Sequence, residues 1–152
     1  FGGVYKLVAV EENGDLIPRI KLSENIEKVT NPGYKTIWRL FDKENNKAIA
    51  DVLTLADEII DDSKEYEIFD PINTWKRKVV TNYYAKKIQV PIFIQGKCVY
   101  KTPKLDEIRK YSLEQVSSLW DEVKRFNNPQ VYYVDLSEKL WNLKNHMIKS
   151  FR

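Results

Sequence analysis

Two lysines near the start of the chain are placed to share an anion. Segments 4–10 and 17–23 are typical of strands, and Asn13-Gly14 between them is the strongest short-range signal for a two-residue hairpin turn. With this turn, Lys6 lies directly opposite Lys21. Two opposed lysines repel by roughly a few tenths to 1 kcal/mol, and a bound anion reverses that sign. The pattern therefore indicates either a phosphate site or two ammonium groups that simply extend into water.

The same register divides the hairpin into a basic and an apolar face. Arg19, opposite Val8, belongs to the basic face. The other face is entirely apolar and pairs Tyr5 with Leu22, Leu7 with Ile20 and Ala9 with Pro18. A slip of one residue would mix the two faces, which a half-buried hairpin resists.

Length, charge and composition exclude several classes of protein. A chain of 152 residues buries one core, and a net charge of +3 supplies no broad basic field for nucleic acid. The single cysteine, Cys98, excludes an internal disulfide and fits a reducing, cytoplasmic setting, and with one histidine it makes no zinc site. No apolar run approaches the roughly 20 residues of a membrane helix, and nothing resembles a signal peptide. The start at Phe1-Gly-Gly suggests a fragment of a longer polypeptide.

Further strands are expected up to about residue 101. Composition predicts strands at Thr36–Phe41 and Ala48–Leu55, neither of which alternates cleanly, so their register stays open. Alternation predicts a strand at Glu65–Phe69. A hairpin around Gln95-Gly96 is expected to join Val90–Ile94 to Lys97–Tyr100.

Two charged segments among these strands each have two interpretations. Four acids in Ala56–Ser63 suggest a metal site or a solvated loop, and the spacing of a hard-cation loop is absent. The basic cluster Trp75–Val80 suggests a single-stranded nucleic-acid contact or an edge strand protected by lysines. His146 is interpreted as a surface residue without a catalytic role.

Helical spacing begins after Pro103. Apolar residues recur through Lys104–Phe126, which predicts one long amphipathic helix whose apolar stripe packs on the β-rich part. Gln130–Val134 is expected to be an extended link. Asp135, with Glu138 three residues later, resembles a capping box that starts a second helix.

These elements predict an α+β fold. An antiparallel, hairpin-rich part at residues 1–101 is followed by a tail of two amphipathic helices at residues 102–152. No nucleophile-and-base pair and no glycine-rich phosphate loop is present, so the chain alone lacks a complete active site.

Ordered sequence matches run along essentially the whole chain and resemble the C-terminal third of nicotinate phosphoribosyltransferase. They include Gly2-Gly-Val-Tyr-Lys-Leu-Val8, Lys21-Leu-Ser-Glu-Asn25, Thr30-Asn-Pro-Gly33, Trp75-Lys-Arg-Lys78, Leu105-Asp-Glu-Ile-Arg109 and Val134-Asp-Leu-Ser137. Phe1 departs from the family, which more often has leucine before the glycine pair.

The resemblance implies the long form of an NAD-salvage enzyme. That family joins nicotinate to 5-phosphoribosyl 1-diphosphate and releases nicotinate mononucleotide and pyrophosphate, with ATP and Mg2+ as cofactors. It further implies that residues 1–42 return to the enzyme's α/β core and that the remainder is the C-terminal domain. The catalytic histidine and phosphate loop would precede Phe1, so the fragment alone is expected to be inactive and to need no cofactor.

The resemblance also implies a site and partners. In the related nicotinamide enzyme, lysines matching Lys6, Lys21 and Lys28 reach phosphate groups at a site shared between two subunits. Lys6, Lys21, Lys28 and Arg19 are therefore the predicted phosphate-binding residues. The expected partners are the rest of the enzyme chain, a second subunit of a homodimer and the phosphorylated substrate. The alternative function is a non-catalytic β-domain whose helical tail docks a protein partner.

Overall fold

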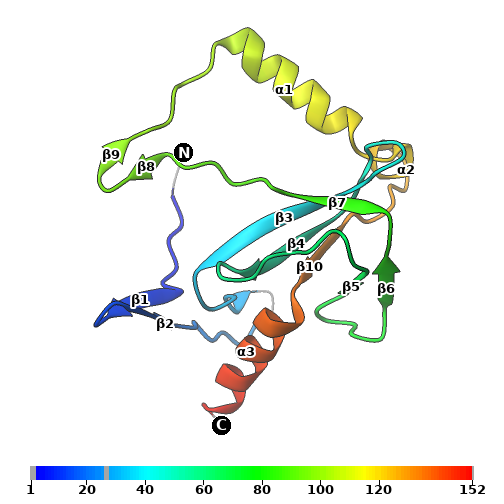
Figure 1. Ribbon diagram of the computed structural model, residues 1–152. Helices are drawn as coiled ribbons and strands as arrows, with labels where there is room; N and C mark the ends of the chain where they lie inside the picture. Colours follow the sequence, from blue (N-terminus) through cyan, green and yellow to red (C-terminus); the bar gives the residue numbers. More distant parts are fainter. Residues whose placement is uncertain (1–2, 26–27, 152) are drawn as a thin grey trace.

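The computed structural model describes residues 3–25 and 28–151 and has an α+β fold, as predicted. Its centre is a four-stranded sheet in the order β10-β4-β3-β7 (Figure 1). Strands β3 (Lys35–Asp42) and β4 (Ala48–Leu55) form its antiparallel middle, so both were predicted correctly.

The two outer strands of this sheet were not predicted. β7 (Tyr83–Lys87) runs antiparallel to β3, and β10 (Tyr133–Leu136) runs parallel to β4. The expected link at 130–134 therefore continues into a strand. A parallel pair needs a long connection between its members, and here the chain from residue 56 to residue 132 supplies it. The tail thus contributes a strand to the sheet, while the proposed division at residue 101 stays a prediction.

The hydrophobic core lies on one face of this sheet. β5 (Tyr66–Phe69) and β6 (Arg77–Val80) form a separate antiparallel ribbon against that face. β6 is an edge strand, as the edge-strand interpretation of the basic cluster expected. Core side chains come from alternate sheet positions, from the ribbon and from the loop between them, and they are Trp38, Leu40, Ala50, Val52, Ile60, Ile68, Val80 and Tyr83.

Helix α3 (Glu138–Lys149) packs on the opposite side and begins later than predicted. Ser137 is its N-cap residue, because the Ser137 hydroxyl accepts from the Leu140 amide at 3.2 Å. Asp135, the predicted cap, instead lies inside β10 and is buried. The Ser137 hydroxyl also donates to Glu58 at 2.8 Å, so one carboxylate of the acidic segment holds the start of α3.

The predicted long helix is two helices, α1 (Leu105–Ser117) and α2 (Asp121–Lys124). The break has a tertiary cause. The Ala48 amide donates to the Ser118 carbonyl at 2.8 Å, and the Lys47 ammonium donates to the carbonyl of Ser117 at 2.7 Å. Donors from the β3–β4 turn therefore take the carbonyls that another helical turn would use.

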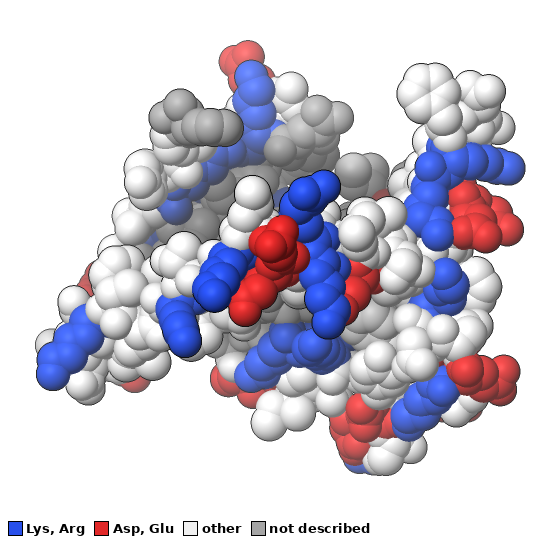
Figure 2. Space-filling model, turned by 90° about the horizontal axis from the view of Figure 1, so that it is seen from above, with Lys and Arg blue, Asp and Glu red and all other residues white. Residues whose placement is uncertain are grey.

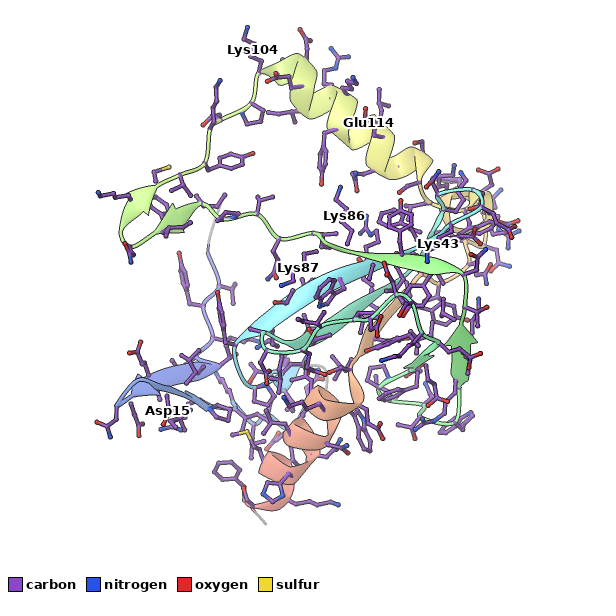
Figure 3. All side chains as sticks on the ribbon, in the orientation of Figure 1. Asp15, Lys43, Lys86, Lys87, Lys104 and Glu114 are labelled. Atoms are coloured by element: carbon purple, nitrogen blue, oxygen red, sulfur yellow. The ribbon has the colours of Figure 1, made fainter. Side chains whose placement is uncertain are left out.

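The apolar stripe of α1 is exposed, so the expected packing on the β-rich part is wrong. No residue of α1 is buried, and Leu105 and Leu113 are 70% and 72% exposed. Lys104 and Glu114 mark a helix that stands away from the sheet (Figure 3). The preceding segment carries the predicted hairpin, β8 (Phe93–Ile94) with β9 (Lys97–Cys98), and it too is exposed. We call residues 88–117 the arm.

Candidate phosphate-binding site

The N-terminal hairpin has the predicted register. β1 (Ala9–Glu12) pairs with β2 (Asp15–Pro18) from Ala9 opposite Pro18 to Glu12 opposite Asp15. Asn13 and Gly14 have φ values of 55° and 89°, the left-handed backbone that a two-residue turn needs and that glycine adopts most readily. Asp15, at the tip, lies far from the central sheet (Figure 3).

The paired strands are much shorter than predicted. The last main-chain hydrogen bond between the two sides of the hairpin runs from the Arg19 amide to the Val8 carbonyl at 2.8 Å. Beyond it, Lys21 pairs with Thr30 instead of Lys6. The Lys21 amide donates to the Thr30 hydroxyl at 2.9 Å, and the Thr30 amide donates to the Lys21 carbonyl at 3.3 Å. The expected ladder position of Lys6 opposite Lys21 is therefore wrong.

The apolar face of the hairpin is also largely uncovered. Tyr5 and Leu7 are 94% and 62% exposed, so this end of the predicted apolar face does not pack on the described part of the chain. Ala9, Pro18 and Ile20, nearer the paired strands, are half-buried. Within residues 3–7, no main-chain hydrogen bond to the described part of the chain extends the ladder.

The four predicted site residues differ in what their side chains contact. The Arg19 guanidinium forms an ion pair with Glu12 at 2.6 Å and donates to the Pro18 carbonyl at 3.2 Å. Lys6, Lys21 and Lys28 are exposed, and within residues 3–25 and 28–151 none of their ammonium groups forms a hydrogen bond or an ion pair. Arg19 is thus already neutralised, whereas the three lysines present their charge to solvent.

A tight turn at residues 31–33 supports this hairpin. The Gly33 amide donates to the Val8 carbonyl at 2.7 Å, at the point where the hairpin ladder ends. Gly33 has φ of +85°, and a Cβ there would lie 2.8 Å from Leu55 Cδ2. Only glycine therefore fits both the backbone conformation and the space beside β4.

Two lysines that were not predicted as site residues hold the same turn. Lys35 donates to the main-chain carbonyls of Asn31 and Gly33, and Lys144 of α3 donates to Asn31 Oδ1 at 2.9 Å. Burial lowers the pKa of both lysines. The sequence offered no sign of the Lys144 contact, because α3 lies more than a hundred residues along the chain from Asn31.

Several other basic residues are paired with acids. Arg39 forms a bidentate pair with Asp51 at 2.7 and 2.9 Å on the outer face of the sheet, and this contact raises the pKa of Arg39. Arg77 pairs with Glu67 in the β5–β6 ribbon. On the face drawn in Figure 2, Lys and Arg lie beside Asp and Glu rather than in one continuous field. The exposed lysines of the predicted site lack such a partner, as do Lys78, Lys86 and Lys97 elsewhere on the described surface.

The comparisons with known proteins agree on one family. The family described as "Nicotinate phosphoribosyltransferase C-terminal domain" matches residues 34–144. The chain belongs to this family.

The relatives extend this match beyond residues 34–144. The nicotinate phosphoribosyltransferase of Bacillus subtilis (strain 168) is 42% identical over 152 residues, which covers 98% of this chain and 31% of the relative. The enzyme of Dictyostelium discoideum is 33% identical over 96% of this chain and 25% of its own length. The crystal structure of human nicotinic acid phosphoribosyltransferase superposes with a TM-score of 0.76 at 30% identity, over 97% of this chain and 27% of that chain. This chain thus spans about a quarter to a third of the enzymes it matches.

Proposed function

We propose that this chain is the C-terminal domain of an enzyme that forms nicotinate mononucleotide and pyrophosphate from nicotinate and 5-phosphoribosyl 1-diphosphate. The similarity to nicotinate phosphoribosyltransferases over nearly the whole chain is the observation that carries the proposal. Because the chain corresponds to at most about a third of those enzymes, the activity belongs to the complete protein, and the isolated domain is expected to be inactive.

Within that enzyme, the hairpin lysines Lys6, Lys21 and Lys28 bind phosphate groups of the phosphoribosyl donor. Negative charge builds up on the leaving pyrophosphate, and cations already in place stabilise it in the transition state. A charge-assisted hydrogen bond contributes about 1.5–3 kcal/mol, and lysine acts as a mobile point charge. Arg19 has a secondary role, since its pair with Glu12 at 2.6 Å competes with a phosphate.

The remaining parts of the proposal concern cofactors and location. Among the described residues, no group of three or more His, Cys, Asp or Glu side chains is placed to hold a metal ion. The assignment of Mg2+ and ATP to the rest of the enzyme is a separate part of the proposal and rests on the resemblance to the family. In the same described part, no helix combines the length and the apolar character needed to cross a membrane. A single cysteine supports a reducing, cytoplasmic setting.

The exposed arm supports the proposed partners, which are the rest of the enzyme chain and a second subunit. An apolar surface of this extent marks an interaction site. The alternative, a non-catalytic domain that docks another protein, uses the same surface. Formation of nicotinate mononucleotide by the complete protein distinguishes the two functions, and the kinetic effect of the hairpin lysines tests the phosphate site.

The test replaces Lys6 and Lys21 by alanine, singly and together, in the complete enzyme. We expect kcat/KM for 5-phosphoribosyl 1-diphosphate to fall about tenfold or more in each single variant, because each loses a charge-assisted bond. Nicotinate binding should change less. If both lysines contact one phosphate, the double variant should lose less than the sum of the two.

Lys64→Ala is the matched control, since the side chain of Lys64 is 77% exposed and lies in a loop away from the hairpin. Thermal melts of the same samples report folding. Normal kinetics in both single hairpin variants would exclude the phosphate site.

A further inference from the structure

A groove of about 750 Å³ lies between helix α3 and the outer face of the sheet. The sheet contributes Ile37, Leu53 and Leu136, and the helix contributes Trp141, Lys144 and Ile148. Trp141 is fixed in place because its indole nitrogen donates to the Pro71 carbonyl at 3.1 Å. The volume is typical of a small-molecule site. The lining is typical as well, because such sites are lined mostly by apolar side chains with few polar groups.

The charge in this groove is unbalanced. Lys144 donates to Asn31 Oδ1, a neutral acceptor, and no carboxylate among the described residues forms an ion pair with it. An ammonium group has three donors, so this contact leaves donors for a ligand. The carboxylate that lines the groove, Asp51, is already neutralised by Arg39 and accepts from Tyr132 at 3.0 Å. A half-buried cation therefore faces an apolar cavity.

We propose that this groove binds a small carboxylic acid with an apolar body. Its carboxylate accepts from the Lys144 ammonium, and its apolar part lies against Trp141, Ile148 and Leu53. Such an anion offsets the cost of burying Lys144, the same cost that lowers the pKa of that lysine. A neutral molecule of the same shape gains only the apolar contact. The site is separate from the hairpin lysines and does not depend on the proposed catalytic role.

The test uses the complete enzyme with two matched probes, octanoate and octanol, measured by calorimetric titration. Octanoate should bind the wild-type protein at least tenfold more tightly than octanol. Lys144→Gln should remove this preference while it keeps a hydrogen-bond donor for Asn31. Lys144→Arg should retain the preference for octanoate. Ile148→Trp should weaken the binding of both probes, because the larger side chain fills the groove.

Lys144→Met provides a second neutral variant, and thermal melts identify any variant that fails to fold. Equal binding of octanoate to the wild type and to Lys144→Gln would overturn the proposal. So would the absence of octanoate binding at millimolar concentration, which is the result expected if another part of the complete enzyme fills the groove.

Discussion

Asp135 is a carboxylate in the interior of the protein. It is 3% exposed, and its Oδ2 atom has no hydrogen-bond partner among the described residues. Burial, with a smaller contribution from the charge of Asp70, raises the pKa of Asp135 to about 6. A buried acid without a cation partner holds its proton more tightly when the chain is folded. Its charge state is therefore linked to stability.

This linkage predicts that the contribution of Asp135 to stability falls as the pH rises from about 4 to about 6. In this range the Asp135 carboxyl is more protonated in the folded state than in the unfolded chain, so its contribution to the free energy of unfolding decreases with pH and then levels off above the folded pKa. Asp135→Asn removes the charge, and we expect it to abolish this slope and to stabilise the protein at pH 7.5 by about 1–3 kcal/mol. Urea unfolding at several pH values measures both effects. Parallel pH profiles for the two proteins would contradict the assignment.

Gly33 and Gly14 form a matched pair, since both have positive φ but only Gly33 is packed. Each change to alanine incurs the left-handed backbone cost of about 1–2 kcal/mol. A Cβ at Gly33 would also lie 2.8 Å from Leu55 Cδ2, whereas nothing lies within 4 Å of one at Gly14. We expect Gly33→Ala to cost about 1–3 kcal/mol more than Gly14→Ala, measured by denaturant unfolding. Equal losses would show that Leu55 moves aside without cost.

Helix α3 and the acidic loop illustrate how one element positions another. The start of the helix is held by Ser137, whose hydroxyl both caps the Leu140 amide and donates to Glu58. The Glu58 carboxylate also accepts from the Leu55 amide at 2.6 Å. The acidic segment Ala56–Ser63, interpreted from the sequence as a metal site or a solvated loop, therefore links the end of β4 to the start of α3 through Glu58.

Ser137→Ala should lower the free energy of unfolding by about 1–2 kcal/mol. The change removes an N-cap bond and leaves Glu58 with one donor fewer. Ser117→Ala is the control, because the Ser117 hydroxyl donates to the Glu114 carbonyl at an exposed helix end, and we expect a change within about 0.5 kcal/mol. A Ser137 variant as stable as the Ser117 variant would show that the cap is dispensable.

The elements that the sequence predicted correctly are those specified by local signals. Asn13-Gly14 determined the hairpin register, and a composition rich in β-branched and aromatic residues located β3 and β4. The errors arose where contacts with a segment distant in the sequence determine the secondary structure. Nothing near Ser118 ends a helix; the donors come from Lys47 and Ala48. Likewise β10 exists because β4 offers a free edge, and Asp135 consequently lies in a strand.

The candidate site was predictable in residue type but not in geometry. Solvent-exposed lysines on a hairpin follow from the turn, yet the pairing of Lys21 with Thr30 depends on how residues 28–33 fold back. The contact of Lys144 with Asn31 requires α3 to pack beside that turn. Both are tertiary contacts that one sequence, without a structure, does not specify.

The molecule as a whole is a packed sheet with an unpacked arm. Large apolar side chains along residues 88–117 are at least 40% exposed: Val90, Ile92, Phe93, Ile94, Val99, Tyr100, Leu105, Ile108, Tyr111, Leu113 and Val116. Among the described residues, hydrogen bonds hold the arm to the sheet at its two ends. At the start, the Ile37 amide donates to Gln89 Oε1 at 3.1 Å. At the end, Arg39 donates to Gln115 at 3.2 Å, and Ser118 accepts from Ala48. In Figure 1 the arm arches away from the sheet. We therefore expect another part of the complete enzyme to cover this surface.

Hydrogen exchange tests this last point. Since no residue of α1 is buried, helix α1 has little tertiary stabilisation in the isolated chain, and a helix of this length is marginal alone. We expect its amides to exchange at least a hundredfold faster than those of β3 and β4. In the complete enzyme the same amides should become protected to within about tenfold of the sheet, because the arm is then covered. The internal control is β3, whose protection should be similar in both proteins. Unchanged fast exchange of α1 in the complete enzyme would show that the rest of the enzyme leaves the arm exposed, and would favour an external protein partner for this surface.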